Sequence, residues 1–368
     1  MENILHYFSK IQDTRQKQGK RYELKSILAL VLIGYMQGYT SLARVYRFGK
    51  TLSKTQKKRL GFKDCKTPSH PTITETMKKI NVVDFEEAIG KITLAKIDPN
   101  FKQIAIDGKS IRSTHGGKEG LLHLVSAYAP KEKGVVAQVK SDLAGGEIDG
   151  ARRALSRVNL KGKVVTGDAM FAQKSLCTQI TKSKGNYLFK VKQNNKRIIN
   201  DINQEFHFYQ NQNLPIISFE SDVSKAHGRI DERHIEVIEV KDKYFGGLDT
   251  IKQIARIHRT FYTLKTKKQT KETRYVMTSL SAKDTSPEEL LKFSVNHWQI
   301  ENNLHRTRDV NFKEDVCTIL SHESQQNNAA MRNLAICLLN KINNSISLAI
   351  ETVVSNIKAA FFILFRRI

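Results

Sequence analysis

Cysteine and tryptophan are scarce in this chain of 368 residues, which contains four of the former and one of the latter. The cysteines at positions 65, 177, 317 and 337 are isolated, and no Cys-x-x-Cys pair is present. A cysteine zinc site and a dithiol redox couple both need such closely spaced pairs. The sequence therefore predicts reduced, mostly buried thiols.

Long apolar runs are also missing. Residues 24–36 are apolar over about a dozen positions, and the run at 359–365 is shorter, whereas a membrane span needs roughly 20 residues. The N-terminus has no basic region followed by an apolar segment, so no secretion signal is predicted. We expect a cytoplasmic, nucleoid-associated protein without membrane contact.

Acidic residues are outnumbered. Against 61 Lys and Arg the chain has 36 Asp and Glu, a net charge of +25 that is spread over the whole length. Such an excess favours a polyanionic partner, and nucleic acid is the expected one. The length and the 40% hydrophobic content suffice for about two domains with a sizeable core.

Three acidic residues nevertheless occupy apolar surroundings. Asp107 ends the run Ile104-Ala105-Ile106, Asp168 follows Val164-Val165-Thr166-Gly167, and Glu301 lies in a helical pattern with Leu290, Phe293, Ile300 and Leu304. A buried anion is costly unless its charge is compensated. In a strongly basic chain, these acids suggest divalent metal ions acting on a phosphate backbone.

The order of secondary structure predicts an α/β fold of the ribonuclease H-like type, a mixed sheet with flanking helices. Three β-rich runs (102–107, 121–128 and 134–140) precede a helix after Gly145-Gly146, a strand at 164–165, a helix at 173–183 and a strand at 187–191. In that fold the first and fourth strands are neighbours. Asp107 and Asp168 would then lie within reach of one pair of metal ions.

The same patterns predict five segments. They are a helical N-terminal domain at 1–98 with a DNA contact, the first part of the catalytic core at 99–205, a β-rich insertion at 206–274, the second part of the core at 275–340 with the Glu301 helix, and a helical tail at 341–368. The basic cluster Lys54, Lys57, Lys58 and Arg59 is the candidate for the N-terminal DNA contact.

The helix that carries Glu301 has a strong start at Ser286-Pro287-Glu288-Glu289. At 100° per residue from Leu290, the stripe of Phe293, His297, Ile300 and Leu304 has Glu301 at its edge, which points Glu301 toward the sheet. Two alternatives remain. In the first, Glu301 pairs with His297 or His305 at i, i+4, which would stabilise the helix by a few tenths of a kcal/mol. In the second, Glu301 joins both histidines in a zinc site, although three ligands so spaced on one straight helix fit a single ion poorly.

Several segments together resemble bacterial insertion-sequence transposases of the D-D-E type, specifically the H-repeat-associated group. They are Ile104-Ala105-Ile106-Asp107-Gly108-Lys109, His123-Leu124-Val125-Ser126-Ala127, Val165-Thr166-Gly167-Asp168-Ala169-Met170, His227-Gly228-Arg229-Ile230, His297-Trp298-Gln299-Ile300-Glu301-Asn302-Asn303-Leu304-His305, Asp309-Val310-Asn311-Phe312-Lys313-Glu314-Asp315 and Asn328-Ala329-Ala330-Met331-Arg332-Asn333. The resemblance runs from about residue 10 to about residue 340. It departs from the group at Arg306 and Arg308, where apolar residues are usual, and in the last 28 residues.

The resemblance implies that Asp107, Asp168 and Glu301 are the catalytic, metal-holding triad. Two Mg²⁺ (or Mn²⁺) ions would orient a water or a 3′-hydroxyl for attack on the phosphodiester. The partners would be double-stranded DNA, namely the terminal inverted repeats of the element and the target, bound by a homodimer or higher homo-oligomer.

Further polar residues near these motifs are candidates for DNA contacts. They are Lys109, Arg112, Lys190, Lys192, Gln193, Arg229, His297, Asn302 and His305. Three functions remain open: an active transposase, a decayed transposase that binds DNA without cutting it, and a ribonuclease H-like nuclease or resolvase without strand transfer.

Overall fold

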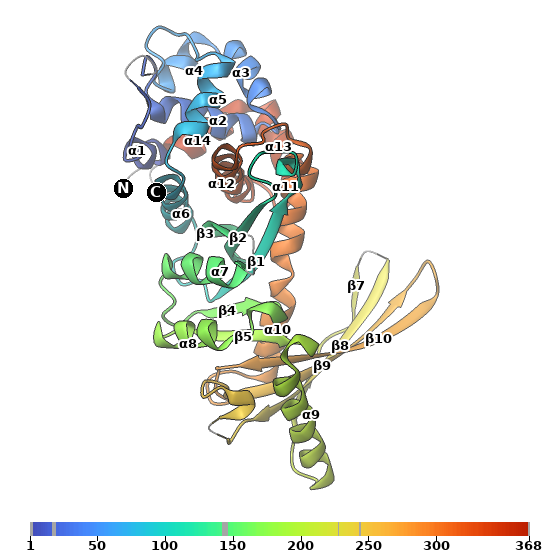
Figure 1. The fold of residues 1–368 in the computed structure, drawn as a ribbon. Coiled ribbons are helices and arrows are strands. Elements are labelled where there is room, and N and C mark those ends of the chain that lie inside the picture. The colour runs from blue at the N-terminus through green and yellow to red at the C-terminus, as the bar shows by residue number, and fades with distance from the viewer. Residues whose placement is uncertain (1–2, 17–19, 142–145, 227, 243, 367–368) are drawn as a thin grey trace. The chain divides into compact units, whose positions relative to one another are not determined.

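The computed structural model describes residues 3–16, 20–141, 146–226, 228–242 and 244–366. The chain forms two compact units, each treated separately below (Figure 1). The first unit contains the chain up to Phe101, the segment Gly108–Val158 and the chain from Gln299 onward. The second contains Lys102–Asp107 and Asn159–Trp298. The boundary therefore divides strand β1 directly after Asp107.

The N-terminal part of the first unit is helical, which confirms the prediction. Its helices are α1 (Ile4–Ser9), α2 (Leu24–Met36), α3 (Leu42–Thr51), α4 (Lys54–Arg59), α5 (His70–Lys79) and α6 (Val82–Lys96). Side-chain caps define several of the helix starts; Ser53 and Gln56 form a reciprocal capping box at α4, for example. Helix α2 is apolar all round and almost wholly buried, as expected for a core helix rather than an amphipathic one.

The buried helix α12 (His322–Leu339) lies at the centre of the first unit. It contacts the N-terminal helices α2, α5 and α6 and also strand β3. Strands β2 (Leu122–Ala129) and β3 (Gly134–Ser141) pair antiparallel. The second part of β1 (Gln103–Ile111) joins them through the hydrogen bond between Ser110 and His123. The remaining elements are η2 (Arg112–Thr114), α7 (Glu147–Ser156), the π-helix η6 (Ile300–His305), α11 (Arg306–Val310), η7 (Glu314–Val316), α13 (Ile346–Ser355) and α14 (Ile357–Phe365).

The second unit is a mixed sheet. The first part of β1, β4 (Val164–Gly167) and β5 (Asn186–Val191) run parallel. Antiparallel strands then follow in the order β10 (Lys268–Thr278), β9 (Gln253–Thr263), β8 (Arg229–Glu239) and β6 (Ile217–Glu220), while β7 (Ser224–Ala226) pairs with β8. Its helices are α8 (Lys174–Lys182), α9 (Lys196–Asn211) and α10 (Pro287–His297), with the short turns η3 (Ala169–Phe171), η4 (Gln193–Asn195) and η5 (Phe245–Gly247).

Helix α10 covers one face of this sheet. Leu290 and Leu291 pack with Val164, Leu188 and Val276 in one buried apolar cluster. The helix begins where the sequence predicts: Ser286 and Glu289 form a capping box, and Pro287 occupies the first turn. This packing places the C-terminal end of α10 over the ends of β4 and β5.

The predicted ribonuclease H-like class is confirmed by the element order and by the parallel pairing of β1 with β4. Three details differ from the sequence expectation. Strand β1 continues past Asp107 to Ile111, a helix (α9) occupies residues 196–211, and β10 pairs directly with β5, so the later strands extend the core sheet. The turn expected at His227-Gly228-Arg229 lies partly outside the described residues, since His227 is not among them.

Among the described residues, no single helix has the length and apolar character of a membrane span; α13 and α14, bent by 101° at their junction, meet that test only as a pair.

Candidate active site

Asp107 and Asp168 both follow the segment in which strands β1 and β4 pair. The printed register runs from Gln103 opposite Val164 to Ala105 opposite Thr166, so Asp107, within β1, and Asp168, directly after β4, each come two residues beyond the last pair. Paired parallel strands are about 4.8 Å apart, and positions in register direct their side chains to the same face. This pairing is consistent with the prediction that the two acids lie close together, and their shared role stays a prediction.

Strand β4 ends directly before Asp168, at Gly167. A Cβ on Gly167 would meet Phe171, Ile106 and Phe189 at 3.0–3.1 Å, so these packed side chains would have to shift to accept a larger residue. Asp168 then leaves the strand as the N-cap residue of η3. Its side chain is 36% exposed, so the carboxylate lies at the edge of the core.

Two cationic or proton-donating groups contact the same oxygen of Asp168. The ammonium of Lys190 donates to Oδ1 at 2.7 Å, and Nε2 of His297 lies 3.3 Å from it. The hydrogen bond from His297, together with the Lys190 ammonium, holds the pKa of Asp168 well below its usual range, although burial acts in the opposite direction. Asp168 is therefore an anion at neutral pH.

His297 is itself held by a buried hydrogen-bonded chain. Its Nδ1 lies 3.3 Å from Oγ1 of Thr166, which accepts a hydrogen bond of 3.0 Å from Nε2 of Gln103. Gln103 also donates to the carbonyl of Phe293 in α10 at 2.8 Å. All three polar side chains are buried. Gln103 and Thr166 were not identified from the sequence, because the only signal for them is their place on the strands, four residues before Asp107 and two residues before Asp168.

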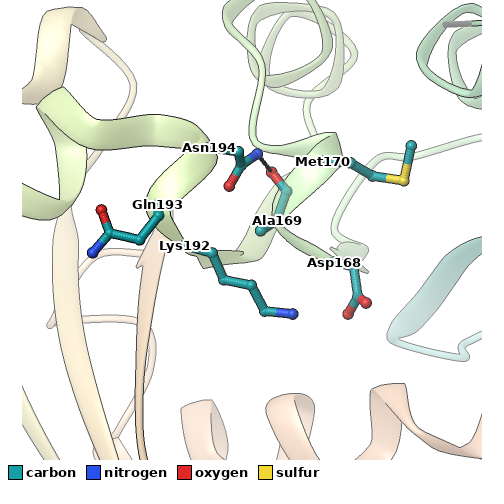
Figure 2. A pocket seen from close by; sticks show the side chains of 6 residues that line it. All are labelled: Asp168, Ala169, Met170, Lys192, Gln193 and Asn194. Atoms are coloured by element: carbon teal, nitrogen blue, oxygen red, sulfur yellow. Dashed lines mark hydrogen bonds between the residues drawn. The ribbon is translucent and has the colours of Figure 1, made fainter.

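An open pocket adjoins Asp168 (Figure 2). It is lined by Asp168, Ala169, Met170, Lys192, Gln193 and Asn194, and Asn194 donates to the carbonyl of Ala169 at 3.0 Å. Lys192 and Gln193 are exposed, and the Lys192 side chain extends into the pocket. Both predicted DNA-contact residues therefore have access to a ligand beside the carboxylate.

A second hollow, which shares Asp168 with the first, is lined by Lys190, Trp298 and Arg274, and neither Trp298 nor Arg274 was predicted to be functional from the sequence. Trp298 is the one tryptophan of the chain. Its ring lies under Lys190 at 4.6 Å and under Arg274 at 5.3 Å. Its position directly after His297 in the resembling motif was the available signal.

The remaining candidates for DNA contacts differ in accessibility. Lys109 is buried, with Nζ 2.7 Å from Asp309 Oδ2 and 3.9 Å from Asp315 Oδ1. Arg112 is 83% exposed, and Asn302 and Arg229 are also exposed. Burial, reinforced by the positive charges of Arg308 and Lys109, lowers the pKa of His305 to about 3. Lys109 and His305 therefore lack the exposure that Arg112, Arg229 and Asn302 have.

Glu301 belongs to the first unit, whereas Asp107 and Asp168 belong to the second. It is half-buried in the π-helix η6, which follows a break in helix α10 at Trp298. A π-helical turn contains more residues than an α-helical one, so the 100° wheel drawn from Leu290 does not hold as far as Glu301. The angular position predicted for Glu301 on an unbroken α-helix is therefore wrong, and the role of Glu301 stays a prediction. π-Helical turns often occur at functional sites.

The donor chemistry fits a hard divalent cation. Asp107 and Asp168 offer carboxylate oxygens, which Mg²⁺ and Mn²⁺ prefer, and Oδ2 of Asp168 has no hydrogen-bond donor among the described residues. In the part of the chain that is described, no three His, Cys, Asp or Glu side chains converge as a metal site. Both ring nitrogens of His297 contact protein groups, Nδ1 with Thr166 and Nε2 with Asp168, and the zinc site with Glu301 and His305 stays an alternative.

Most of the chain matches two known protein families. Residues 99–338 match the family described as "Transposase DDE domain", and residues 5–92 match the family described as "DDE_Tnp_1-associated". The protein belongs to the DDE transposase family, with the associated N-terminal domain.

Among similar proteins are two from Escherichia coli (strain K12). "Putative protein YbfL" is 28% identical and "H repeat-associated putative transposase YhhI" 27% identical, each over 347 residues that cover 92% of this chain and 90% of the relative. Among solved structures, a piggyBac transposase synaptic complex with hairpin DNA aligns over 99% of this chain and 79% of that one, with a TM-score of 0.45 and 9% identity. At that TM-score the likeness supports no conclusion about chemistry.

Proposed function

We propose that this protein is an active D-D-E transposase that cuts the ends of its own insertion sequence and joins them to target DNA. The observation that carries the proposal is the parallel pairing of β1 with β4, after which Asp107 and Asp168 each follow by two residues, with Asp168 lining an open pocket, in a chain of this family. Asp168 also keeps one oxygen free of donors among the described residues.

In this proposal Asp107, Asp168 and Glu301 would hold two Mg²⁺ or Mn²⁺ ions. When bound, such ions activate a water or a 3′-hydroxyl and stabilise the leaving oxygen of the phosphodiester. Lys190 and His297 would hold the Asp168 carboxylate in place, and exposed side chains would position the DNA. Lys192 and Gln193, exposed on the rim of the pocket, would contact the phosphate next to the scissile bond.

DNA would be bound over several basic surfaces. Helix α4 has no buried residue and carries three basic residues in its last turn. A second basic surface lies where β9 and β10 join, far along the long strands from α10 (Figure 1). Its exposed cations are Lys265, Lys267, Lys268 and Lys271. Release of counterions from the DNA would then make affinity strongly salt-dependent, and the element's two ends would be joined by a homodimer or higher homo-oligomer.

Cleavage and joining assays with the inverted repeats that flank the gene test the proposal in the presence of Mg²⁺. Asp107→Asn, Asp168→Asn and Glu301→Gln should each reduce cleavage below detection while DNA binding persists, because each removes a charged metal ligand. Asp149→Asn is the matched control, since Asp149 is an exposed acid that pairs with Arg153 one turn along α7.

The alternatives give different results in the same assay. Wild-type protein that binds the ends without cutting them would be a decayed transposase, and cleavage without joining would indicate a nuclease or resolvase. Substantial cleavage by any of the three triad variants contradicts the site assignment. Activity that persists in EDTA, or that needs zinc alone, contradicts the metal assignment.

A further inference from the structure

We propose that Gln103, Thr166 and His297 form a positioning relay that fixes the carboxylate of Asp168 and turns its Oδ2 outward as a metal ligand. The relay deepens the proposed function and rests on it for the role of Asp168. It assigns His297 and Lys190, which the sequence offered as DNA contacts, to the support of a ligand instead.

The first observation is that both donors to Asp168 contact one oxygen. Lys190 and His297 lie 2.7 and 3.3 Å from Oδ1, and no described residue donates to Oδ2. An aspartate carboxylate otherwise rotates freely, since its last torsion has broad minima. Two donors on one oxygen stop that rotation and leave the other oxygen toward the pocket that Asp168 lines.

The second observation is that the relay has a direction. The amide nitrogen of Gln103 can only donate, so Oγ1 of Thr166 accepts from Nε2 at 3.0 Å. The hydroxyl proton of Thr166 then has two acceptors, Nδ1 of His297 at 3.3 Å and the carbonyl of Ile104 at 3.5 Å. Donation to the nearer Nδ1 leaves the imidazole proton on Nε2, where it faces Asp168. The Thr166 hydroxyl thereby selects the tautomer that donates to the carboxylate.

The third observation is the arrangement of these residues on the sheet. Side chains two residues apart on a strand share a face. Gln103 and Asp107, four residues apart, therefore share a face of β1, and Thr166 lies on the adjoining face of β4, two residues before Asp168. Helix α10, which carries His297 at its last residue, is tied to this face by the bond from Gln103 to the Phe293 carbonyl.

Burial separates positioning from DNA contact. The side chains of His297 and Lys190 are 5% and 8% exposed, so neither can lie against a phosphate of a bound duplex without leaving its place. Lys192, two residues after Lys190, is exposed and remains available for that contact. Residues that orient a metal ligand typically change metal affinity or activity by 10–100-fold when they are replaced.

Trp298 supplies a direct reporter for the test. It is the only tryptophan, and it lines a pocket together with Asp168 and Lys190. Titration of the full-length protein with Mn²⁺, followed by tryptophan fluorescence, therefore measures occupancy beside Asp168 without DNA or turnover. Thr166→Val and His297→Leu should raise the Mn²⁺ midpoint by about 10–100-fold, and Asp168→Asn should abolish the response.

Conservative variants distinguish the relay from simple packing. His297→Gln keeps a donor near the position of Nε2, and Thr166→Ser keeps the hydroxyl, so both should restore most of the Mn²⁺ affinity. Thr76→Val is the matched control: Thr76 is a buried threonine whose hydroxyl bonds only to the carbonyl of Thr72 within α5. It should leave the midpoint unchanged.

The outcomes separate the relay from the proposed function. Folded Thr166→Val with a wild-type Mn²⁺ midpoint overturns the relay, even if the wild type cuts DNA. A relay-dependent Mn²⁺ midpoint in a protein that cuts no DNA retains the relay and refutes the transposase activity. If Thr166→Val does not fold, the Mn²⁺ midpoints of His297→Gln and His297→Leu are compared instead. Equal Mn²⁺ midpoints in these two variants overturn the relay. In assays of cleavage, kcat should fall while KM for DNA stays constant.

Discussion

Two anionic residues, Asp168 in the second unit and Glu314 in the first, are each held by two cationic or proton-donating partners, but their exposure differs. Glu314 and its partners Arg308 and Arg332 are fully buried. Oε2 of Glu314 lies 2.7 Å from Arg308 and Oε1 lies 2.9 Å from Arg332, so both oxygens are used. Asp168 has one oxygen so used and lies at the edge of an open pocket.

The difference separates a carboxylate that holds the fold together from one that can take a ligand. Glu314 connects η7 to α11 and to the central helix α12, and Lys109 pairs with Asp309 and Asp315 in the same unit. These pairs account for the Asp309–Asp315 motif and for Arg308, one of the departures from the resembling group. A buried carboxylate is thus no sign of catalysis when every oxygen has a partner.

The largest expected effect is on stability, and it should fall on Glu314. Glu314→Gln leaves two buried guanidinium groups with no opposing charge, so the free energy of unfolding should drop by about 3–5 kcal/mol. Asp168→Asn should lower it by less than Glu314→Gln does, because the Asp168 carboxylate is partly exposed, although its partner Lys190 is buried. Urea denaturation of both variants provides the measurement. Equal losses of stability would remove the distinction between the two carboxylates.

The second effect is the pH dependence of that stability. Burial alone would raise the pKa of Glu314, but the charges of Arg308 and Arg332 outweigh it and hold the pKa below its usual range. A depressed folded-state pKa means that the stabilisation is complete above the unfolded value of about 4.3 and is lost as the pH falls toward the folded value. Below about pH 4.3 the unfolded state binds the extra proton.

Denaturation of wild type and Glu314→Gln between pH 6 and pH 3 tests this sign. The wild type should lose up to about 1.4 kcal/mol more per pH unit in the acid range than the variant, which corresponds to one proton. Glu87→Gln, at an exposed position of α6, is the control that should keep the wild-type slope. A steeper acid slope in Glu314→Gln would contradict the ion-pair interpretation.

Much of the core could be predicted because its signals are local. The strands that lead to Asp107 and Asp168, the helix start at Ser286 and the helical N-terminal region each follow from nearby apolar patterns or caps, although β1 continues past Asp107. Parallel pairing of β1 with β4 followed from the element order once the fold class was recognised. The five domain ranges remain predictions, and the compact units divide the chain differently.

What the sequence did not show depends on long-range contacts. The relay joins Gln103, Thr166 and His297 across 63 and 131 positions, and no single segment contains two of its members. The ion pair between Lys109 and Asp309 spans 200 positions. The π-helical turn at Glu301 was missed because apolar spacing read at 100° per residue assumes an unbroken α-helix.

The smallest expected effect distinguishes two lysines that look alike in sequence. Lys192 is exposed on the pocket rim, whereas the ammonium of Lys109 is buried against Asp309. If Lys192 contacts a phosphate, Lys192→Gln should reduce the slope of log Kobs against log salt concentration by about 0.9, the value for one contact with duplex DNA. Lys109→Met should leave the slope unchanged, since no counterion is displaced by a group that is already paired within the protein. A reduced slope for Lys109→Met, measured with folded protein, would mean that the Lys109–Asp309 pair opens on DNA. Lys109 would then belong with Asp168 as a group that meets the ligand, and not with Glu314 as one that holds the fold.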